Sequence, residues 1–278
     1  VLKKKRLQNL KKYKNFTFYK FNLENKKKVN LVFSKKKFDI IIHLAAQAGV
    51  KYSIKNPRKY LDSNILGFFN ILENCKKYKP KKIFYASSSS VYGNSATFPL
   101  NERQAIKPVN FYGMTKKNNE EMSELYAEYY NLKLIGLRFF TVYGEWGRPD
   151  MVVFKLLESA FRGKLFKLFN KGNHYRDFTY IDDVTDIIQR LIKHKFKDKH
   201  TVLNVCSSKP IKLTFLLKLC KKNELKINLR KVGFQKADII KTHGENKLLK
   251  KYAKKNNFID FEVGFKKCIE WYKKVYIK

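Results

Sequence analysis

The alternation of short apolar runs with longer amphipathic segments constrains the fold of this chain more than any other feature. The runs FDIIIHL (38–44) and KIFYAS (82–87) are apolar along most of their length, and a third run covers 132–139. Strands of this kind are buried on both faces, as in a parallel sheet that helices cover. Helical patterns over 57–78 and 111–130 separate the three runs. The sequence therefore predicts an α/β fold with a Rossmann-type, doubly wound parallel sheet.

Shorter elements follow after about residue 145, and they are joined by lysine-rich loops. An amphipathic helix is predicted over 263–275 near the end of the chain, and a short strand is predicted over 16–21 near its start. We therefore expect one domain over 1–145 and a smaller, mixed α/β lobe over 146–278, with the chain crossing between them.

The first residues lack the feature that usually opens a dinucleotide-binding domain. Such a domain begins with a strand and a GxxGxxG turn, which seats a pyrophosphate at the N-terminus of a helix. This chain begins at Val1 with a basic, helix-like stretch and contains no GxxGxxG. We therefore expect the first βαβ portion of the sheet to be missing.

The apolar runs and the cysteines indicate the compartment. No apolar run approaches the roughly 18 residues that are needed to cross a bilayer. The four cysteines lie far apart and form no CxxC pair, which is typical of reduced thiols without a zinc site. The sequence predicts a soluble, cytoplasmic protein with no metal and no membrane partner.

The formal net charge of +38 raises the question of a nucleic-acid partner. The excess is nearly all lysine and is spread over the whole chain. A nucleic-acid reader more often concentrates its charge on one face and uses arginine for bidentate contacts. We therefore favour a compositional bias and expect no nucleic-acid partner, and a basic protein that acts on nucleic acid remains the alternative.

A tyrosine and a lysine four residues apart carry the strongest chemical signal. Tyr112 and Lys116 lie on one face of a predicted helix and follow a run of serines (87–90) at the end of a predicted strand. A nearby ammonium favours the phenolate, so we expect the pKa of Tyr112 to lie below its ordinary value. The phenolate could then take a hydroxyl proton while hydride leaves the same carbon, with a serine relaying the proton. A solvated helix face and a strand cap are the plain alternatives.

Several ordered motifs carry a resemblance to a known family. They are HLAAQAGVKYS (43–53), DSNILGFFNILE (62–73), YASSSSVYG (85–93), YGMTK (112–116), LRFFTVYGEWGRPDM (137–151), YRDFTYIDDV (175–184), QKADIIKT (235–242) and EWYKK (270–274). Together they resemble the NAD-dependent epimerase/dehydratase family of extended short-chain dehydrogenases, and most closely its UDP-glucuronate 4-epimerases. The resemblance covers essentially the whole chain.

The resemblance assigns catalytic roles at the serine run and on the helix after it. It implies that Tyr112 is the acid/base, that Lys116 is its pKa partner and also reaches the nicotinamide ribose, and that Ser88 relays the proton. Ser89 and Ser90 would contact the substrate, and either could share the relay.

The resemblance also implies NAD as the cofactor, bound by the domain over 1–145. Backbone at Leu44, Ala45 and Ala46 would line it, and Phe139 would lie near the nicotinamide. Asn22 stands where the family usually has an Asp that accepts from the adenine amino group, and its amide oxygen could still accept. The remaining cofactor contacts implied by the resemblance are Asn64 and Ser87.

The UDP-sugar would bind the lobe over 146–278. The resemblance implies that Arg176 contacts the diphosphate, and that Thr141 and Arg148 hold a sugar carboxylate, for which a planar guanidinium is suited. The alternatives are a surface arginine beside Asp177 for Arg176 and a solvated turn residue for Arg148.

The residues after the relay serine select among the reactions of the family. Related dehydratases carry an Asp-Glu pair there and decarboxylases a Glu, whereas this chain has Ser89 and Ser90. The expected reaction is therefore epimerisation at C4 through a 4-keto sugar, from UDP-glucuronate to UDP-galacturonate. The alternatives are a UDP-hexose or UDP-N-acetylhexosamine epimerase, and an inactive truncated fragment. A homodimer through the helices over 57–78 and 111–130 is implied by the resemblance alone.

Overall fold

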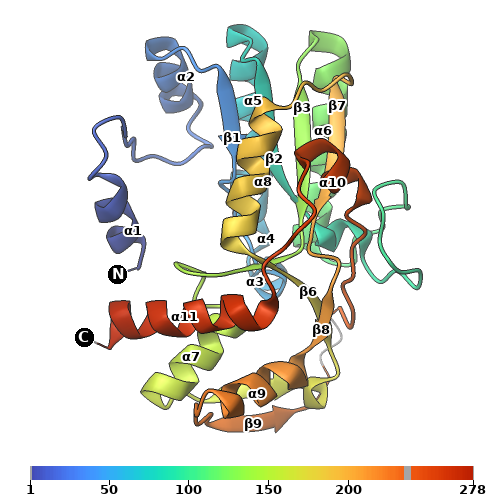
Figure 1. Ribbon diagram of the computed structural model, residues 1–278. Helices are drawn as coiled ribbons and strands as arrows, with labels where there is room; N and C mark the ends of the chain where they lie inside the picture. The colour runs from blue at the N-terminus through green and yellow to red at the C-terminus, as the bar shows by residue number, and fades with distance from the viewer. Residues whose placement is uncertain (1, 235–238, 278) are drawn as a thin grey trace.

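The computed structural model describes residues 2–234 and 239–277. Its larger layer is a four-stranded parallel sheet in the order β1-β2-β3-β7 (Figure 1). Its strands are β1 (Ile40–His43), β2 (Lys82–Ser88), β3 (Leu134–Phe139) and β7 (His200–Val205). The predicted parallel α/β sheet is confirmed.

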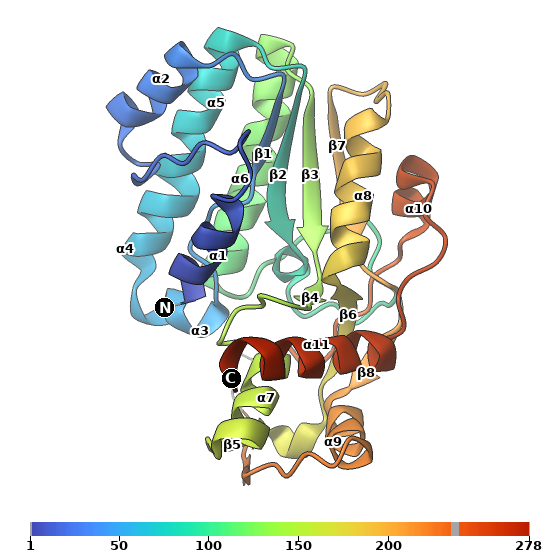
Figure 2. The same cartoon turned by 60° about the vertical axis from the view of Figure 1, so that its left-hand side comes forward.

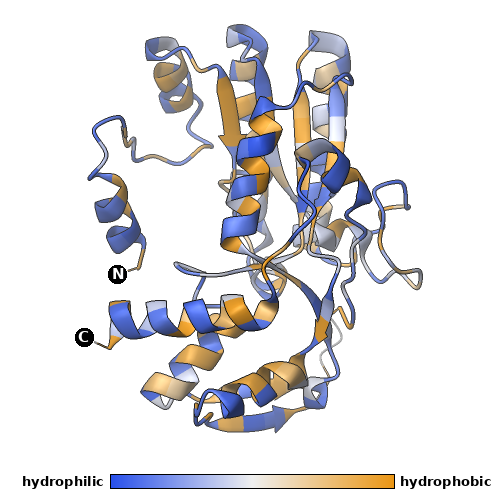
Figure 3. Ribbon diagram, viewed as in Figure 1, coloured by the Kyte–Doolittle hydropathy of each residue, from blue (hydrophilic) through white to orange (hydrophobic). Residues whose placement is uncertain are grey.

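Helices cover both faces of this sheet (Figure 2). Phe84 of β2 packs in a cluster with residues of α8 (Ile181–Lys193) and α10 (Lys247–Ala253). Tyr85, one residue later, packs on the other face with residues of α2 (Lys26–Lys35), α5 (Gly67–Tyr78) and α6 (Phe111–Tyr130). Because successive strand side chains point to opposite faces, both must be apolar, and this explains the unbroken apolar runs (Figure 3).

The predicted helices form with small changes at their ends. The pattern over 57–78 becomes three joined segments, α4 (Pro57–Tyr60), the π-helical turn η1 (Leu61–Leu66) and α5. The pattern over 111–130 becomes α6 with the same bounds. At the chain ends, the basic stretch forms α1 (Leu2–Leu10) and the C-terminal pattern forms α11 (Phe261–Tyr276).

The predicted strand over 16–21 is wrong. These residues follow an irregular path and carry no strand pairing. Their aromatic side chains, with residues of β1 and α2, line an apolar groove of about 530 Å³. A strand exists only through its ladder of hydrogen bonds to a neighbour. The aromatic residues of this segment therefore line a groove without forming a strand, and Phe18 and Tyr19 remain exposed.

The second lobe is smaller and mixed, as expected. A three-stranded sheet contains β4 (Thr141–Tyr143), β6 (Tyr175–Tyr180) and β8 (Pro210–Lys212), with β6 antiparallel to β8. A two-stranded parallel sheet joins β5 (Phe166–Phe169) to β9 (Leu229–Val232). These strands pack with α7 (Val152–Arg162), α9 (Leu213–Lys222) and α11 around an aromatic core.

The chain returns from this lobe to the larger layer, because β7 is a strand of the four-stranded sheet and α8 packs on one face of that sheet (Figure 1). A domain boundary at residue 145 stays a prediction. Within the described ranges 2–234 and 239–277, helices of the length and apolarity needed to cross a membrane do not occur.

Candidate active site

The carboxyl ends of β1, β2 and β3 meet at one edge of the sheet, and the predicted site lies there. Ser88 is the last residue of β2, and the 3₁₀ turn η2 (Ser89–Tyr92) follows it. The first turn of α6 lies against η2. A β-carbon at Gly113 would come within 2.6 Å of the Ser90 carbonyl oxygen, so this approach requires glycine.

Tyr112 and Ser88 come together as predicted. Burial raises the pKa of the Tyr112 phenol above its ordinary value, while a hydrogen bond from Ser88 and the charge of Arg148 act to lower it. The expected depression of the Tyr112 pKa is therefore wrong for this structure. The reason is that burial outweighs the favourable contacts, and the nearby ammonium is directed elsewhere.

Lys116 lies almost fully buried, at 1% exposure, one helical turn after Tyr112. Its Nζ donates to the carbonyl oxygen of Ala86 at 2.8 Å. Burial lowers the pKa of Lys116 to about 8. An ammonium has three donors, so Lys116 can hold further hydroxyl groups beside Ala86.

His43 is a functional candidate that the sequence analysis did not single out. It ends β1, is buried, and stacks on Phe68 with 5.0 Å between ring centroids. Burial, followed by the charge of Lys116, lowers the pKa of His43 to about 3, so the imidazole is neutral. The signal was a histidine that ends a buried apolar strand.

Of the residues expected to line a cofactor, some are exposed or half-buried at the sheet edge, and others have side chains that are hydrogen-bonded to protein groups. Leu44, Ala45 and Ala46 are exposed immediately after β1, at the carboxyl edge of the sheet. Phe139 is half-buried at the end of β3, opposite Ser88 in the register. Asn22 is exposed in the segment before α2.

Asn64 and Ser87 have side chains that protein groups already engage. The Asn64 amide accepts from the Gln47 N–H at 2.7 Å and donates to the Gln47 carbonyl and to Thr115 Oγ1, both at 3.0 Å. It therefore ties the loop after β1 to α6. Ser87 donates to Glu120 at 2.5 Å. Contacts of either residue to a cofactor stay predictions.

The expected substrate residues lie in both layers. Ser89 and Ser90 form the start of η2, and Thr141 opens β4. Arg148 donates two hydrogen bonds to the Asp150 carboxylate, one of them 2.9 Å long from Nε. A β-carbon at Gly49 would lie 3.6 Å from Arg148 Nη2, so the guanidinium lies beside the loop after β1. Its charge acts to lower the pKa of Tyr112.

Arg176 lies farther along the second lobe, on β6. It donates to the carbonyl oxygens of Tyr175 at 2.8 Å and Ile240 at 3.1 Å. Asp177 is fully buried and accepts from the N–H groups of Ser207, Ser208 and Gly244, so its carboxylate faces the interior. Of the QKADIIKT motif, residues 235–238 lie outside the described residues.

These features define a class: an α/β protein with a doubly wound sheet and a tyrosine, lysine and serine at its carboxyl edge, as in short-chain dehydrogenases. The chain belongs to the NAD-dependent epimerase/dehydratase family, whose model matches residues 1–206.

Individual relatives agree with this assignment. An uncharacterised protein of Methanocaldococcus jannaschii is 40% identical over 274 residues, which is 98% of this chain and 83% of that protein. UDP-glucuronate 4-epimerase 4 of Arabidopsis thaliana is 37% identical over 258 residues, 86% of this chain and 59% of that protein. The structure of UDP-glucuronic acid 4-epimerase from Bacillus cereus, in complex with UDP-glucuronic acid and NAD, matches with a TM-score of 0.92 and 26% identity. It covers 99% of this chain and 87% of that chain.

Proposed function

We propose that this protein is an NAD-dependent UDP-sugar 4-epimerase that interconverts UDP-glucuronate and UDP-galacturonate. The observation that carries the proposal is the meeting of Ser88 and Tyr112 above a buried Lys116, with the Arg148 charge close by. The identity to UDP-glucuronate 4-epimerases supports the substrate class.

The residues present fit the nicotinamide end of the cofactor. Lys116 has donors to spare for ribose hydroxyls, and the exposed residues 44–46 offer a surface for the ring. No GxxGxxG turn for the pyrophosphate occurs in the 278 residues. NAD held there would supply an acceptor for the C4 hydride and would later return that hydride.

The protein's own groups handle the proton. Ser88 hydrogen-bonds the C4 hydroxyl and passes its proton to Tyr112, and the process reverses after the 4-keto sugar has turned in the site. The groups that favour the phenolate form of Tyr112 are Ser88 and the charge of Arg148. Lys116 would instead hold hydroxyl groups of the cofactor beside the Ala86 carbonyl. Ser89 and Ser90 bring no carboxylate to the sugar, so elimination of water has no acid/base pair to drive it.

The proposed preference for a uronic acid rests on Arg148, which would bind the carboxylate of the sugar. Exchange of the Asp150 carboxylate for the sugar carboxylate would keep the guanidinium paired and hold the C–CO₂⁻ bond away from alignment with the C4 carbonyl. Thr141 would support the same carboxylate. We expect Arg148→Ala to slow epimerisation of UDP-glucuronate at least tenfold and to release some UDP-pentose. Unchanged rate and products, measured by NMR, would remove this role.

The pairing of Arg148 with Asp150 favours a second candidate, an epimerase of neutral UDP-hexoses or UDP-N-acetylhexosamines. In that enzyme the pair would stay intact and Arg148 would only shape the site. Separate incubations with UDP-glucuronate, UDP-glucose and UDP-N-acetylglucosamine distinguish the two, because only the first candidate requires the carboxylate.

The arrangement also supports a homodimer. Large apolar side chains are exposed along η1, α5 and α6, and the most exposed are Leu125 at 55% and Tyr129 at 75%. Others on the same helices are Leu61, Leu66 and Phe69. Apolar side chains gathered on neighbouring helices are typical of an interface.

A further inference from the structure

A buried ion pair lies beneath the candidate site, between α6 and β3. Arg138 donates to Glu120 twice, from Nε at 2.9 Å and from the terminal nitrogen Nη2 at 2.7 Å. The two side chains are only 5% and 6% exposed. Burial would lower the pKa of Arg138, but the hydrogen bonds and charge of Glu120 raise it above its ordinary value, so the guanidinium stays charged.

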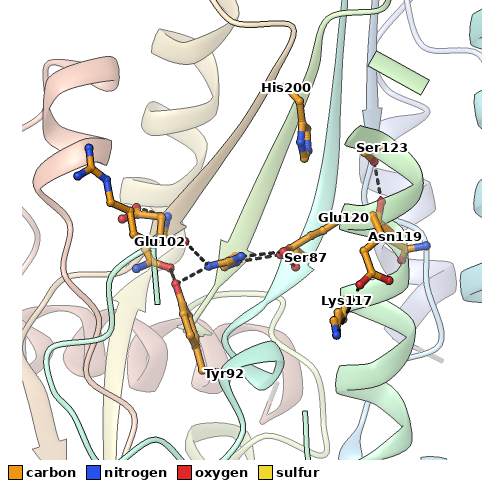
Figure 4. A network of polar contacts seen from close by, with 12 residues as sticks. Ser87, Tyr92, Glu102, Lys117, Asn119, Glu120, Ser123 and His200 are labelled. Carbon is orange, nitrogen blue, oxygen red and sulfur yellow. Dashed lines mark hydrogen bonds and ion pairs between the residues drawn. The ribbon is translucent and has the colours of Figure 1, made fainter. Parts of the chain in front are cut away.

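The pair is the centre of a larger polar network (Figure 4). Ser87 of β2 donates to Glu120, and Arg138 donates to the Tyr92 hydroxyl at 2.8 Å. Tyr92 in turn donates to Asn204 of β7 at 2.7 Å. One helix, three strands and η2 are thus joined by directional bonds in a region of low dielectric, where such bonds are strong.

Four members of the network are near neighbours of proposed site residues along the chain. Ser87 precedes Ser88, Arg138 precedes Phe139, and Tyr92 closes the turn that begins with Ser89. Glu120 follows Lys116 by four residues, so the two lie on one face of α6.

The buried face of α6 explains why these bonds matter. Its buried residues are small or polar: Gly113, Thr115, Lys116, Asn119, Glu120, Ser123 and Ala127. Apolar packing is not directional, and α6 contributes to the apolar cluster mainly through its later residues Met122, Tyr126, Ala127 and Tyr130. The position of the first half of α6 against β2 and β3 therefore depends on polar contacts. Glu120–Arg138 is the only pair of opposite charges that the described part of α6 makes with the sheet.

We propose that Glu120 and Arg138 are positioning residues, which hold α6 against the carboxyl ends of β2 and β3 so that Tyr112 and Lys116 meet Ser88. The proposal rests on the proposed function for its kinetic test. A displacement of about 1 Å at a reacting group can cost about 100-fold in rate, so an ion pair that fixes this geometry acts on kcat.

The first test compares Glu120→Gln with a matched control. The control is Asp183→Asn, which breaks the mostly buried Asp183–Lys255 pair (2.9 Å, 3% and 14% exposed) on the opposite face of the sheet. Both variants should unfold at lower temperature. We expect kcat to fall 10- to 100-fold in Glu120→Gln with KM changed less than about threefold, and kcat to stay native in Asp183→Asn. Equal kcat in both variants overturns the proposal.

The second test removes both charges while keeping the volume, in Glu120→Leu/Arg138→Met. Apolar replacement of a whole buried pair is often neutral for stability. A stable double variant with lowered kcat supports positioning, and a stable variant with native kcat overturns it. If the double variant does not fold, Glu120→Asp decides: it keeps the charge but shortens the reach, and native kcat in it overturns the proposal.

Hydrogen exchange provides a readout that needs no turnover. In Glu120→Gln, amides of 86–93 and 111–117 should exchange faster, while those of the control face should not. If native protein epimerises no UDP-sugar, the proposed function fails, and the exchange pattern still decides the positioning role. Uniformly faster exchange over the whole protein, or no change at 86–93, overturns it.

Discussion

At the scale of single residues, the proposed reaction depends on the Tyr112 phenol. Tyr112→Phe removes one oxygen and leaves the backbone N–H of residue 112 to donate to Ser53. We expect kcat to fall about 10²- to 10⁴-fold, because proton transfer loses its acid/base, while the unfolding temperature stays close to native. Product formation followed by NMR checks this. A Phe variant that keeps more than a tenth of the native rate would show that another group moves the proton.

The buried Lys116 should make the free energy of unfolding depend on pH. Burial lowers its folded pKa to about 8, below its ordinary value of 10.5. Between these values the unfolded chain binds the proton more tightly, so the free energy of unfolding should rise with pH in this window, by roughly 3 kcal/mol in total. Below pH 8 the group contributes no slope.

The measurement compares native protein with Lys116→Met by denaturant unfolding between pH 7 and 10.5. The variant should lack that part of the slope, since the other titrating groups are unchanged. Identical slopes in the two proteins would mean that Lys116 titrates normally in the folded state.

At the scale of elements, the contact between α6 and η2 holds the site together. In Gly113→Ala the new β-carbon would lie 2.6 Å from the Ser90 carbonyl oxygen and 3.0 Å from Pro108 Cβ. We expect a loss of about 1–3 kcal/mol in stability and a large loss of kcat, because α6 must move away from the serines. Gly233→Ala is the control, since no atom of the residues that the structure describes lies within 4 Å of its β-carbon. Equal behaviour of the two variants would contradict the close approach.

Many of the helices and strands could be predicted from the sequence. The bounds of α6 are marked by Asn110, which accepts from the Gly113 N–H at 2.8 Å, and by Asn131, which adopts a left-handed conformation. The strand over 16–21 could not be predicted correctly, because apolar alternation shows what a segment can bury and not whether a partner strand lies beside it.

Only part of the site could be predicted, because the sequence shows which elements follow one another but not the register between strands. The serine run and YxxxK lie on adjacent elements, so the meeting of Ser88 and Tyr112 followed from the βαβ order. The Glu120–Arg138 pair depends on the register that sets Ser87 opposite Arg138, which the sequence does not specify. The pKa direction of Tyr112 was missed because burial cannot be judged from a helical pattern.

At the scale of the whole molecule, the proposed homodimer makes the exposed face of α6 an interface. Leu125→Glu/Tyr129→Glu should shift the protein to a monomer, because two charges would be desolvated between the helices. Light scattering after size-exclusion chromatography measures this. Val263→Glu, at an exposed apolar residue of α11, is the control and should not change the mass. A native protein that is monomeric at all concentrations would contradict the proposed dimer.

The central claim for the whole molecule is that UDP-glucuronate is epimerised at C4 at the carboxyl edge of the sheet. The most direct test is incubation of the protein and NAD with UDP-glucuronate carrying deuterium at C4, followed by NMR of the products. The account predicts UDP-galacturonate that retains the deuterium at C4, because the hydrogen that leaves that carbon returns to its other face without exchanging with water. Inversion with loss of the deuterium, or no UDP-galacturonate while neutral UDP-hexoses are epimerised, would contradict it.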